Sequence, residues 1–452
     1  MDRASVDPRR VRPLKDRPER EGPIVYWMSR DQRSRDNWAL LQAAELARQR
    51  DVRLCVVFCL VPEFMGATWR QYAFMIQGLI GTESELAARG IGFRLLLGQP
   101  WTELPPFLHE VGAGAVVTDF DPIKIKVEWK RKVTSGTFIP FYEVDAHNTV
   151  PCWLVSSRKI ETLDNYRRKL VPLLDGFLTE IPDLPNMERP WNAEGTDWDM
   201  AMRSLIVDRS VPEVDWIRPG ESAAKEMLDR FCANKLSDYP QKGMDPNQDG
   251  QSNLSGYLHF GHLSGQRVAL EVKKADVPEE AKQKYLDRVI VQREIADNFC
   301  LHNPNYDSFG GFPEWARRSI DEHRSDPRDH VYSLEQFEKG LTHDPLWNAA
   351  QTEMVKRGKM HGSLRPYWAS KILEWTRTPE QAYEIAIYLN DKYQLDGRDA
   401  SGYSGIAEVI GGLYDRPWAA KEVMGKVKKL TYTGQRMRFD VHNYCEYVQG
   451  LK

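Results

Sequence analysis

The N-terminal third of the chain alternates short apolar runs with segments whose apolar residues recur at helical spacing. The runs are typical of buried strands, at residues 24–27, 53–60, 93–97, 115–118 and 138–144. The segments between them are typical of amphipathic helices, at residues 37–49, 69–89, 101–111 and 123–134. This order predicts βαβ units in a parallel sheet, with any ligand at the carboxyl ends of the strands.

The pattern changes after residue 151. Residues 152–219 are irregular and rich in Pro, Asp and Trp, which predicts a long connection over the surface. Beyond them the period is helical, and we expect helices at residues 223–235, 262–275, 281–300, 333–339, 345–357, 366–376 and 379–392. The sequence therefore predicts a Rossmann-like α/β domain at residues 21–151, a connecting linker at 152–219 and an all-helical domain at 220–452.

Composition narrows the class of protein. A chain of 452 residues is too long for one core, and 41% hydrophobic with 28% charged residues indicates a soluble globular protein. The net charge of −3 excludes a generally basic surface but leaves room for a local basic face. No apolar run is long enough for a transmembrane helix. Residues 1–20 are charged and Pro-rich, which predicts a flexible tail rather than a secretory signal.

The cysteines and the α/β segment exclude several further classes. Six cysteines without a CxxC pair argue against disulfides and favour a reducing cytoplasm. The α/β segment contains neither GxGxxG nor GxxxxGK[ST], so neither nucleotide fingerprint supports a dinucleotide or NTP site there. We assign no metal site.

A hydroxyl- and amide-rich stretch at residues 252–255 is typical of the opening of a helix. It consists of Ser252, Asn253, Leu254 and Ser255 in the run QSNLSGYLHFGH. Such a stretch offers free N–H groups and side-chain donors, which a pyrophosphate needs. An ordinary helix N-cap explains the same residues without a ligand.

Three tryptophans gather near the 366–376 helix. Trp368 and Trp375 are seven residues apart, so they share a helix face and lie ~10 Å apart along its axis. Trp347 belongs to the preceding helix and can meet that face. Three such indoles can pass an electron stepwise from the surface to a buried acceptor, although aromatic residues at this spacing also serve simply as core.

Two charged features complete the candidate chemistry. Asp396 can pair with Arg365, and a buried ion pair steers the electronics of a ring beside it. A polar loop with helix caps is the alternative interpretation. Near the C-terminus, cations and aromatic residues interleave as on a nucleic-acid-binding face, although a solvated surface has the same composition. The cations are Lys426, Lys428, Lys429, Arg436 and Arg438.

Seven short sequence blocks, taken with their order along the chain, indicate one protein family. The blocks are SNLSGYLHFGHLS, QREIADNFC, THDPLWNAAQ, GKMHG, YWASKILEW, YLNDKYQLDGRD and RFDVHNY. Together they resemble the signature blocks of class II photolyases, which belong to the photolyase–cryptochrome family, in that family's own order. The similarity covers nearly the whole chain beyond the first 20 residues.

The resemblance implies an antenna-type α/β domain and a helical domain that holds FAD in a bent shape. Residues 252–255 would contact the FAD phosphates. Arg365 and Asp396 match the family's ion pair beside the isoalloxazine, and Asn390 matches the asparagine near flavin N5. The three tryptophans match the chain that photoreduces the flavin. The implied reaction is light-driven electron donation to a cyclobutane pyrimidine dimer (CPD) flipped out of DNA. An antenna pigment, a deazaflavin or a folate, is an open possibility.

The departures from the family pattern gather at positions that face the substrate. Arg288 stands where the family has its active-site glutamate, and Glu408 stands where it has a tryptophan wall. Arg cannot accept a hydrogen bond from the dimer side, although its charge can still stabilise an anion. A carboxylate offers no stacking surface. The two side chains are also expected to pair across the pocket. The remaining departures are Met244, Gln292 and Pro366, and Pro366 places a helix start near residue 363.

Three hypotheses follow from this pattern. The first is a photolyase-like protein that photoreduces FAD in blue light, is impaired in or lacks CPD repair, and serves as a photoreceptor or in another light-dependent role. It would bind DNA weakly, without strong lesion preference. The second is a working class II photolyase with an unusual pocket. The third is a light-independent flavoprotein or nucleic-acid-binding module.

Overall fold

The computed structural model describes residues 6–18 and 20–451. Its N-terminal part is built on a six-stranded sheet with the order β1-β6-β5-β2-β3-β4. Strands β2 to β6 are parallel, as predicted, whereas β1 at the edge is antiparallel to β6. The strands are β1 (Val11–Lys15), β2 (Ile24–Met28), β3 (Leu54–Leu60), β4 (Gly92–Leu97), β5 (Ala115–Asp119) and β6 (Phe141–Val144).

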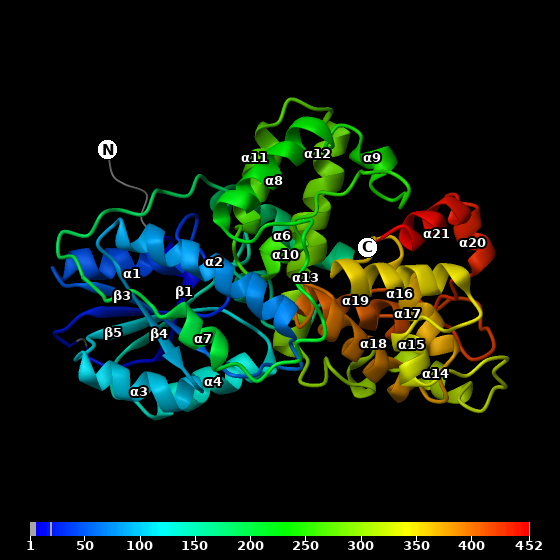
Figure 1. The fold of residues 1–452 in the computed structure, drawn as a ribbon, viewed down its shortest axis with the longest axis horizontal. Helices are drawn as coiled ribbons and strands as arrows, with labels where there is room; N and C mark the ends of the chain where they lie inside the picture. The colour runs from blue at the N-terminus through cyan, green and yellow to red at the C-terminus, as the bar shows by residue number, and fades with distance from the viewer. Residues whose placement is uncertain (1–5, 19, 452) are drawn as a thin grey trace.

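Helices cover both faces of this sheet (Figure 1). Alternate residues of β2 face opposite layers, with Tyr26 in the core beneath one pair of helices and Trp27 in the core beneath the other. Because both faces are buried, the strands read as continuous apolar runs, which made them visible in the sequence. The helices are α1 (Trp38–Gln49) and α2 (Trp69–Ala87) on one face, and α3 (Pro100–Glu110) and α4 (Lys124–Ser135) on the other.

The expected flexible tail at residues 1–20 is wrong for residues 6–15, where Val6 is buried and regular structure begins at Pro8. Residues Pro8–Arg10 form the 3-10 helix η1, and β1 follows it into the sheet. Arg10 is fully buried, and its guanidinium donates to the carbonyl oxygens of Asp145, Asn148 and Thr149 at 3.1, 3.1 and 2.6 Å. These acceptors lie more than 130 residues away, so local composition gave no sign of them. Residues 1–5 and 19 lie outside the described residues.

The expected irregular linker at residues 152–219 is wrong in part. It contains α5 (Cys152–Val155), α6 (Leu163–Phe177) and α7 (Trp198–Arg203). Helix α6 buries Tyr166 and Leu170 against the helical domain, so it belongs to that core rather than to a surface connection. Pro172 inside α6 and its charged outer face concealed the helix in the sequence.

Residues from α8 onward are helical, as predicted. One expected helix at residues 281–300 is a continuous run of α12 and α13 with the π-helix η2 between them, and π-helical turns are frequent at functional sites. Pro366 occupies the first turn of α17, where its missing N–H costs nothing. Sequence periodicity missed α14, α19 and α21.

The elements of the helical domain in chain order are α8 (Glu221–Asn234), α9 (Tyr239–Lys242), α10 (Ser255–His259), α11 (Gly265–Lys274), α12 (Glu279–Leu286), η2 (Asp287–Gln292), α13 (Arg293–His302), η3 (Phe309–Gly311), α14 (Glu314–Glu322), α15 (Leu334–Glu338), α16 (Pro345–Arg357), α17 (Arg365–Glu374), α18 (Pro379–Tyr393), α19 (Ala400–Gly411), α20 (Tyr432–Arg436) and α21 (Val441–Gln449).

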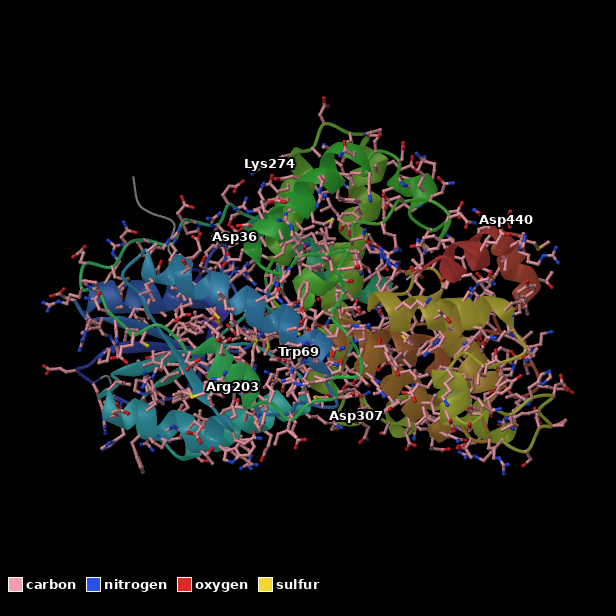
Figure 2. The ribbon with its side chains drawn as sticks, in the orientation of Figure 1. Asp36, Trp69, Arg203, Lys274, Asp307 and Asp440 are labelled. Atoms are coloured by element: carbon pink, nitrogen blue, oxygen red, sulfur yellow. The ribbon has the colours of Figure 1, made fainter. Side chains whose placement is uncertain are left out.

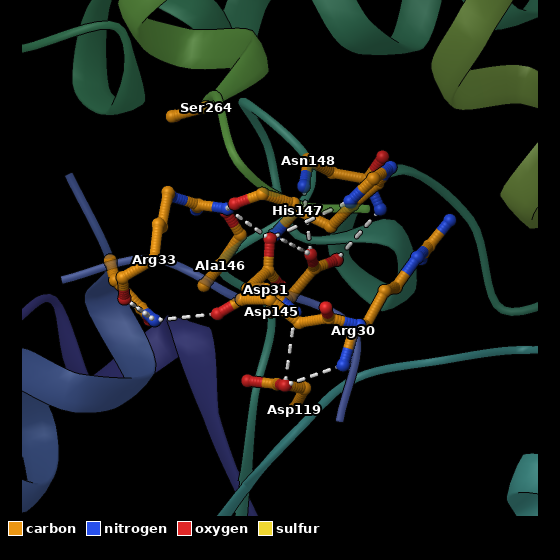
Figure 3. A network of polar contacts seen from close by, with 12 residues as sticks. Arg30, Asp31, Arg33, Asp119, Asp145, Ala146, His147, Asn148 and Ser264 are labelled. Atoms are coloured by element: carbon orange, nitrogen blue, oxygen red, sulfur yellow. Dashed lines mark hydrogen bonds and ion pairs between the residues drawn. The ribbon is translucent and has the colours of Figure 1, made fainter. Parts of the chain in front are cut away.

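A buried polar network lies where the α/β domain meets the helical domain, and Figure 3 shows its α/β side, with Arg30, Asp31, Asp145 and Asn148. The guanidinium of Arg30, just beyond β2, forms two 2.8 Å bonds with the carboxylate of Asp297 on α13. The same carboxylate accepts from Asn148 at 2.8 Å. Closer to the surface, Arg267 pairs with Asp36 at 2.8 Å, and Lys124 pairs with Asp307 (both acids are labelled in Figure 2). The two domains therefore meet at an interface that contains both buried and more exposed ion pairs.

No helix among residues 6–18 and 20–451 is both long and apolar enough to cross a membrane. The same described part of the chain contains no cluster of three or more His, Cys, Asp or Glu side chains suited to a metal ion.

Candidate functional site

The hydroxyl-rich stretch forms the loop that leads into α10. Leu254 anchors this loop in the core at 1% exposure, while Ser255 remains exposed. Asn253 adopts the left-handed conformation at φ 60°, which is uncommon for a non-glycine residue. Helix α10 has only five residues, so we expect its dipole to contribute little. The polar side chains of the loop are therefore its main means of holding an anion.

Arg365 and Asp396 form the ion pair expected from the sequence. The Nη2 atom of Arg365, at the start of α17, lies 2.7 and 2.8 Å from the two Asp396 oxygens and 2.9 Å from Gln394 Oε1. Burial alone would raise the pKa of Asp396, but the Arg365 charge and hydrogen bonds, including one from Ser255, hold it below its usual range. Ser255 and this pair thus belong to one site, and Arg365 remains about one-third exposed.

Asn390 lies near this pair on the last turns of α18. Its Nδ2 donates to Asp391 Oδ1 at 2.9 Å, which fixes the amide, and its side chain is 5% exposed. A Cβ on Gly397 would stand 2.6 Å from the Asn390 carbonyl oxygen. Glycine is therefore required where the loop carrying Asp396 crosses α18.

The three tryptophans form a continuous aromatic path. Trp347 on α16 lies between the other two, with ring centroids 6.3 Å from Trp368 and 6.2 Å from Trp375. Trp347 Nε1 donates to the Trp368 carbonyl oxygen at 3.0 Å, and Trp368 Nε1 donates to Gln351 Oε1 at 2.9 Å. All three rings are at most 3% exposed. Because Trp368 follows Arg365 by one turn of α17, the path begins beside the ion pair.

Most residues expected to alter a substrate pocket lie on three facing elements. Arg288 and Gln292 are both exposed on η2, and Arg288 Nη1 donates to Gln292 Oε1 at 3.2 Å. A Cβ added to Gly362 would lie 3.6 Å from Arg288 Nη2, so η2 approaches the segment that leads into α17. Pro366 is half-buried on α17, and Met244, in the loop before residue 252, is 47% exposed.

The expected ion pair between Arg288 and Glu408 is wrong. Within the described ranges, no oxygen of Glu408 on α19 lies within 4 Å of the Arg288 nitrogens, since Arg288 bonds to Gln292 instead. The two charges still interact. Glu408 reaches solvent on one side, yet partial burial raises the pKa of its carboxyl, and Arg288 opposes that rise. The two side chains therefore do not close this site.

The C-terminal cations differ in whether their charges have a partner within the protein. Lys429 is paired with Glu374 at 2.9 Å, and Lys428 lies over the Trp418 ring at 4.8 Å. No carboxylate in residues 6–18 or 20–451 pairs within 4 Å with the exposed side chains of Lys426, Arg436 or Arg438. Lys428 is also close enough to Glu408 to lower the pKa of its carboxyl. The cationic face thus borders the altered site.

A separate cleft opens at the carboxyl ends of the strands, where the α/β fold predicts a ligand. The cleft is open to solvent at its mouth. Its walls combine rings such as Trp129 and Phe64 with polar groups such as Lys126, Asp121 and Arg398. The cleft lies between the two domains and is distinct from the Arg365–Asp396 site.

Comparison with known proteins decides the family. The DNA photolyase family model matches residues 24–186. A deoxyribodipyrimidine photo-lyase of Potorous tridactylus is 46% identical over 93% of this chain and 80% of its own length. The chain belongs to the photolyase family. The Arabidopsis thaliana photo-lyase is 44% identical over 99% of this photolyase-family chain and 94% of its own. A bacterial class III photolyase from Agrobacterium tumefaciens shares the fold, with a TM-score of 0.72 at 18% identity over 95% of this chain and 86% of that one.

Sequence analysis assigned no role to three residues near the candidate site. Gln394 supports Arg365, Gln351 holds the indole of Trp368, and Lys359 donates to the side-chain oxygen of Asn253. Each partner is distant in sequence or on another element. All three lie in blocks that carried the family resemblance, Gln351 in THDPLWNAAQ, Lys359 in GKMHG and Gln394 in YLNDKYQLDGRD, but their contacts arise only from tertiary packing.

Proposed function

We propose that this photolyase-family protein binds FAD, reduces it in light through Trp368, Trp347 and Trp375, and is impaired in CPD repair. The aromatic path that begins beside the Arg365–Asp396 pair is the observation that carries the proposal. The polar loop at residues 252–255, Arg365 and Asn390 would hold the cofactor. These residues suit it, because they combine hydroxyl and amide donors with a cation that one carboxylate balances.

FAD, when bound, would supply a light-absorbing group that accepts and donates single electrons. The protein's own contribution is the route and its surroundings. The hydrogen bond from Trp368 Nε1 to Gln351 fixes the first indole, and the bond from Trp347 Nε1 fixes the second. Their burial excludes water along the path. Low exposure of all three rings makes them suited to pass charge rather than to bind a ligand.

The substrate side supports only weak lesion recognition. Arg288 cannot accept a hydrogen bond, and Glu408 gives a flipped base no stacking surface while adding negative charge near DNA phosphates. We expect a preference below ~1 kcal/mol for CPD-containing over undamaged DNA, because both contacts are missing. The cations at Lys426, Lys428, Arg436 and Arg438 would supply binding that is independent of sequence.

The cleft between the domains is suited to a second, light-harvesting pigment such as a deazaflavin or a folate. Its aromatic walls match a planar ring, and Lys126 and Arg398 match polar or anionic substituents. We further propose a cytoplasmic location, since six free cysteines fit a reducing compartment.

Working CPD repair is the second candidate function. Two observations favour it: the identity of 44–46% to curated photo-lyases, and the absence, among described residues, of an Arg288–Glu408 ion pair that would close the site. The deciding experiment is repair yield under blue light on a CPD-containing oligonucleotide, with the Potorous enzyme as positive control. We expect FAD to photoreduce and the dimers to persist. Efficient repair would replace the first candidate with the second, and a protein that binds no FAD would end both.

A further inference from the structure

Lys359 is a cation without a counter-ion in the candidate cofactor site. It lies in the segment between α16 and α17, and its Nζ donates a hydrogen bond to Asn253 Oδ1. Among residues 6–18 and 20–451, no carboxylate oxygen lies within 4 Å of this nitrogen. A largely buried ammonium whose contacts are one neutral oxygen and the Trp216 ring, 5.7 Å away, is costly, which calls for an anion at this point.

The two nearest acids cannot supply that anion, because each has other partners. Glu353 on α16 accepts from the His361 N–H at 3.0 Å and from the Tyr444 hydroxyl at 2.8 Å. Asp396 is held by Arg365. The charges of Glu353 and Asp396 raise the pKa of the Lys359 amine, but not enough to offset the effect of its burial.

Burial and the neighbouring cations oppose the charge on Lys359. Burial is the largest cause, and Arg357 on α16 and Arg365 on α17 act in the same direction. Together they lower the pKa of this lysine to about 8. At pH values near or above 8 the amine is therefore partly neutral and gains a proton when an anion approaches.

The position of Lys359 identifies the anion. Asn253, its partner, is the residue in left-handed conformation at the centre of the 252–255 loop. We propose that Lys359 binds the diphosphate of FAD together with this loop and supplies the positive charge that the hydroxyl and amide donors lack. The assignment rests on the proposed function, and it adds that binding at alkaline pH takes up one proton.

A purely structural role is the competing explanation, in which Lys359 only supports the strained Asn253. Lys359→Gln separates the two, since its amide can still donate to Asn253 Oδ1 but carries no charge. Lys359→Arg keeps the charge at every pH used. Lys356→Gln on α16 is the matched control, because Lys356 is exposed and donates only to the Leu451 carbonyl oxygen.

The test titrates apoprotein with FAD by calorimetry from about pH 7 to about pH 9.5, in buffers of different ionisation enthalpy. At neutral pH, Lys359→Gln should bind FAD about 10- to 100-fold more weakly, as expected for loss of a charged hydrogen bond, while Lys356→Gln is unchanged. Wild-type affinity should be constant below about pH 8. Above it, affinity should fall by up to about tenfold per pH unit with proton uptake. Lys359→Arg should show neither the fall nor the uptake.

The titrations distinguish failure of the Lys359 inference from failure of the proposed function. If the wild-type protein binds FAD and Lys359→Gln binds it equally well, without a difference in proton uptake, Lys359 is structural and the inference is overturned while the proposed function stands. If the wild-type protein binds no FAD at all, the proposed function falls and takes the inference with it. Thermal melting of each variant identifies any that fails to fold, and Lys359→Arg then carries the comparison through its pH profile.

Discussion

Trp347 stacks on Trp368 with their ring planes 6° apart, although 21 residues separate them in the chain. It meets Trp375 at 66° on its other side. Within the described chain, Trp368 and Trp375 make no ring contact with each other, despite sharing α17 and its C-cap. The middle station of the path is thus supplied by α16, and the two ends are supplied by α17.

This arrangement predicts that Trp347→Phe interrupts photoreduction as completely as Trp368→Phe. Either change breaks the stack of Trp347 on Trp368, which is the one ring contact of Trp368 among the described residues, while Phe preserves most of the packing. Trp375→Phe should slow the process less, because two stations remain. The measurement is the rate at which bound FAD bleaches under blue light, with FAD content checked for each variant.

Trp101→Phe is the control, since Trp101 lies on α3 in the other domain, against Trp129. It should photoreduce as the wild-type protein does. Unchanged rates in Trp347→Phe and Trp368→Phe would mean that electrons reach the cofactor by another route.

The C-terminal cations predict a specific salt dependence of DNA binding. Each free cation that contacts a phosphate should contribute about 0.9 to the slope of log K against log salt on duplex DNA. Arg436→Gln, Arg438→Gln and Lys426→Gln should each reduce the slope by up to that amount, equally for damaged and undamaged DNA. The measurement is fluorescence anisotropy across a salt series.

Lys429→Gln provides the internal control for this series. Its ammonium is engaged by Glu374 at 2.9 Å, so it has little charge to offer a phosphate. We expect its slope to match the wild-type slope. A fall as large as that of Arg436→Gln would show that the Lys429–Glu374 pair opens on DNA, and equal slopes in all variants would place the DNA elsewhere.

Particular residues show which parts of the fold and of the candidate site could be predicted from the sequence. Periodicity found β2 to β6 because both faces of the sheet are buried, and it placed Trp368 and Trp375 together because helical spacing is local. It could not find β1, whose neighbour Arg10 is stabilised by carbonyl groups 135 to 139 residues away. Lys359 was equally invisible, since a lysine in a loop is ordinarily solvated and its burial arises only from tertiary packing. The prediction of an Arg288–Glu408 ion pair was wrong for a related reason. Arg288 lies on the π-helix η2, where the side chain of Gln292 is its hydrogen-bond partner.

The interface between the domains predicts a large stability loss. Asp297→Ala leaves the guanidinium of Arg30 buried without its carboxylate and also removes an acceptor of Asn148. We expect a loss of about 3–5 kcal/mol in the free energy of unfolding, measured in urea. Arg30→Met with Asp297→Leu should recover part of it, because neither charge is then stranded.

Glu85→Ala is the matched control for that prediction. It removes ion pairs with Arg35 and Arg89, but the Glu85 side chain is 39% exposed, so the cost should stay below about 1 kcal/mol. If Asp297→Ala were as mild as Glu85→Ala, water would have to reach Arg30, and the network would not fasten the domains.

The altered substrate site allows a gain-of-function test. Arg288→Glu restores a group that can accept a hydrogen bond, and Glu408→Trp restores a stacking wall worth ~1–3 kcal/mol per base. The two residues face one site, where Arg288 lowers the pKa of the Glu408 carboxyl, so their effects should be coupled rather than additive. Arg288→Glu alone would set two carboxylates against each other and should weaken DNA binding. The double variant should bind CPD-containing DNA at least several-fold more tightly than undamaged DNA, whereas the wild-type protein should barely discriminate. A competition assay with the two DNAs measures this preference, and a double variant that still fails to discriminate would show that Met244, Gln292 or Pro366 controls the site instead.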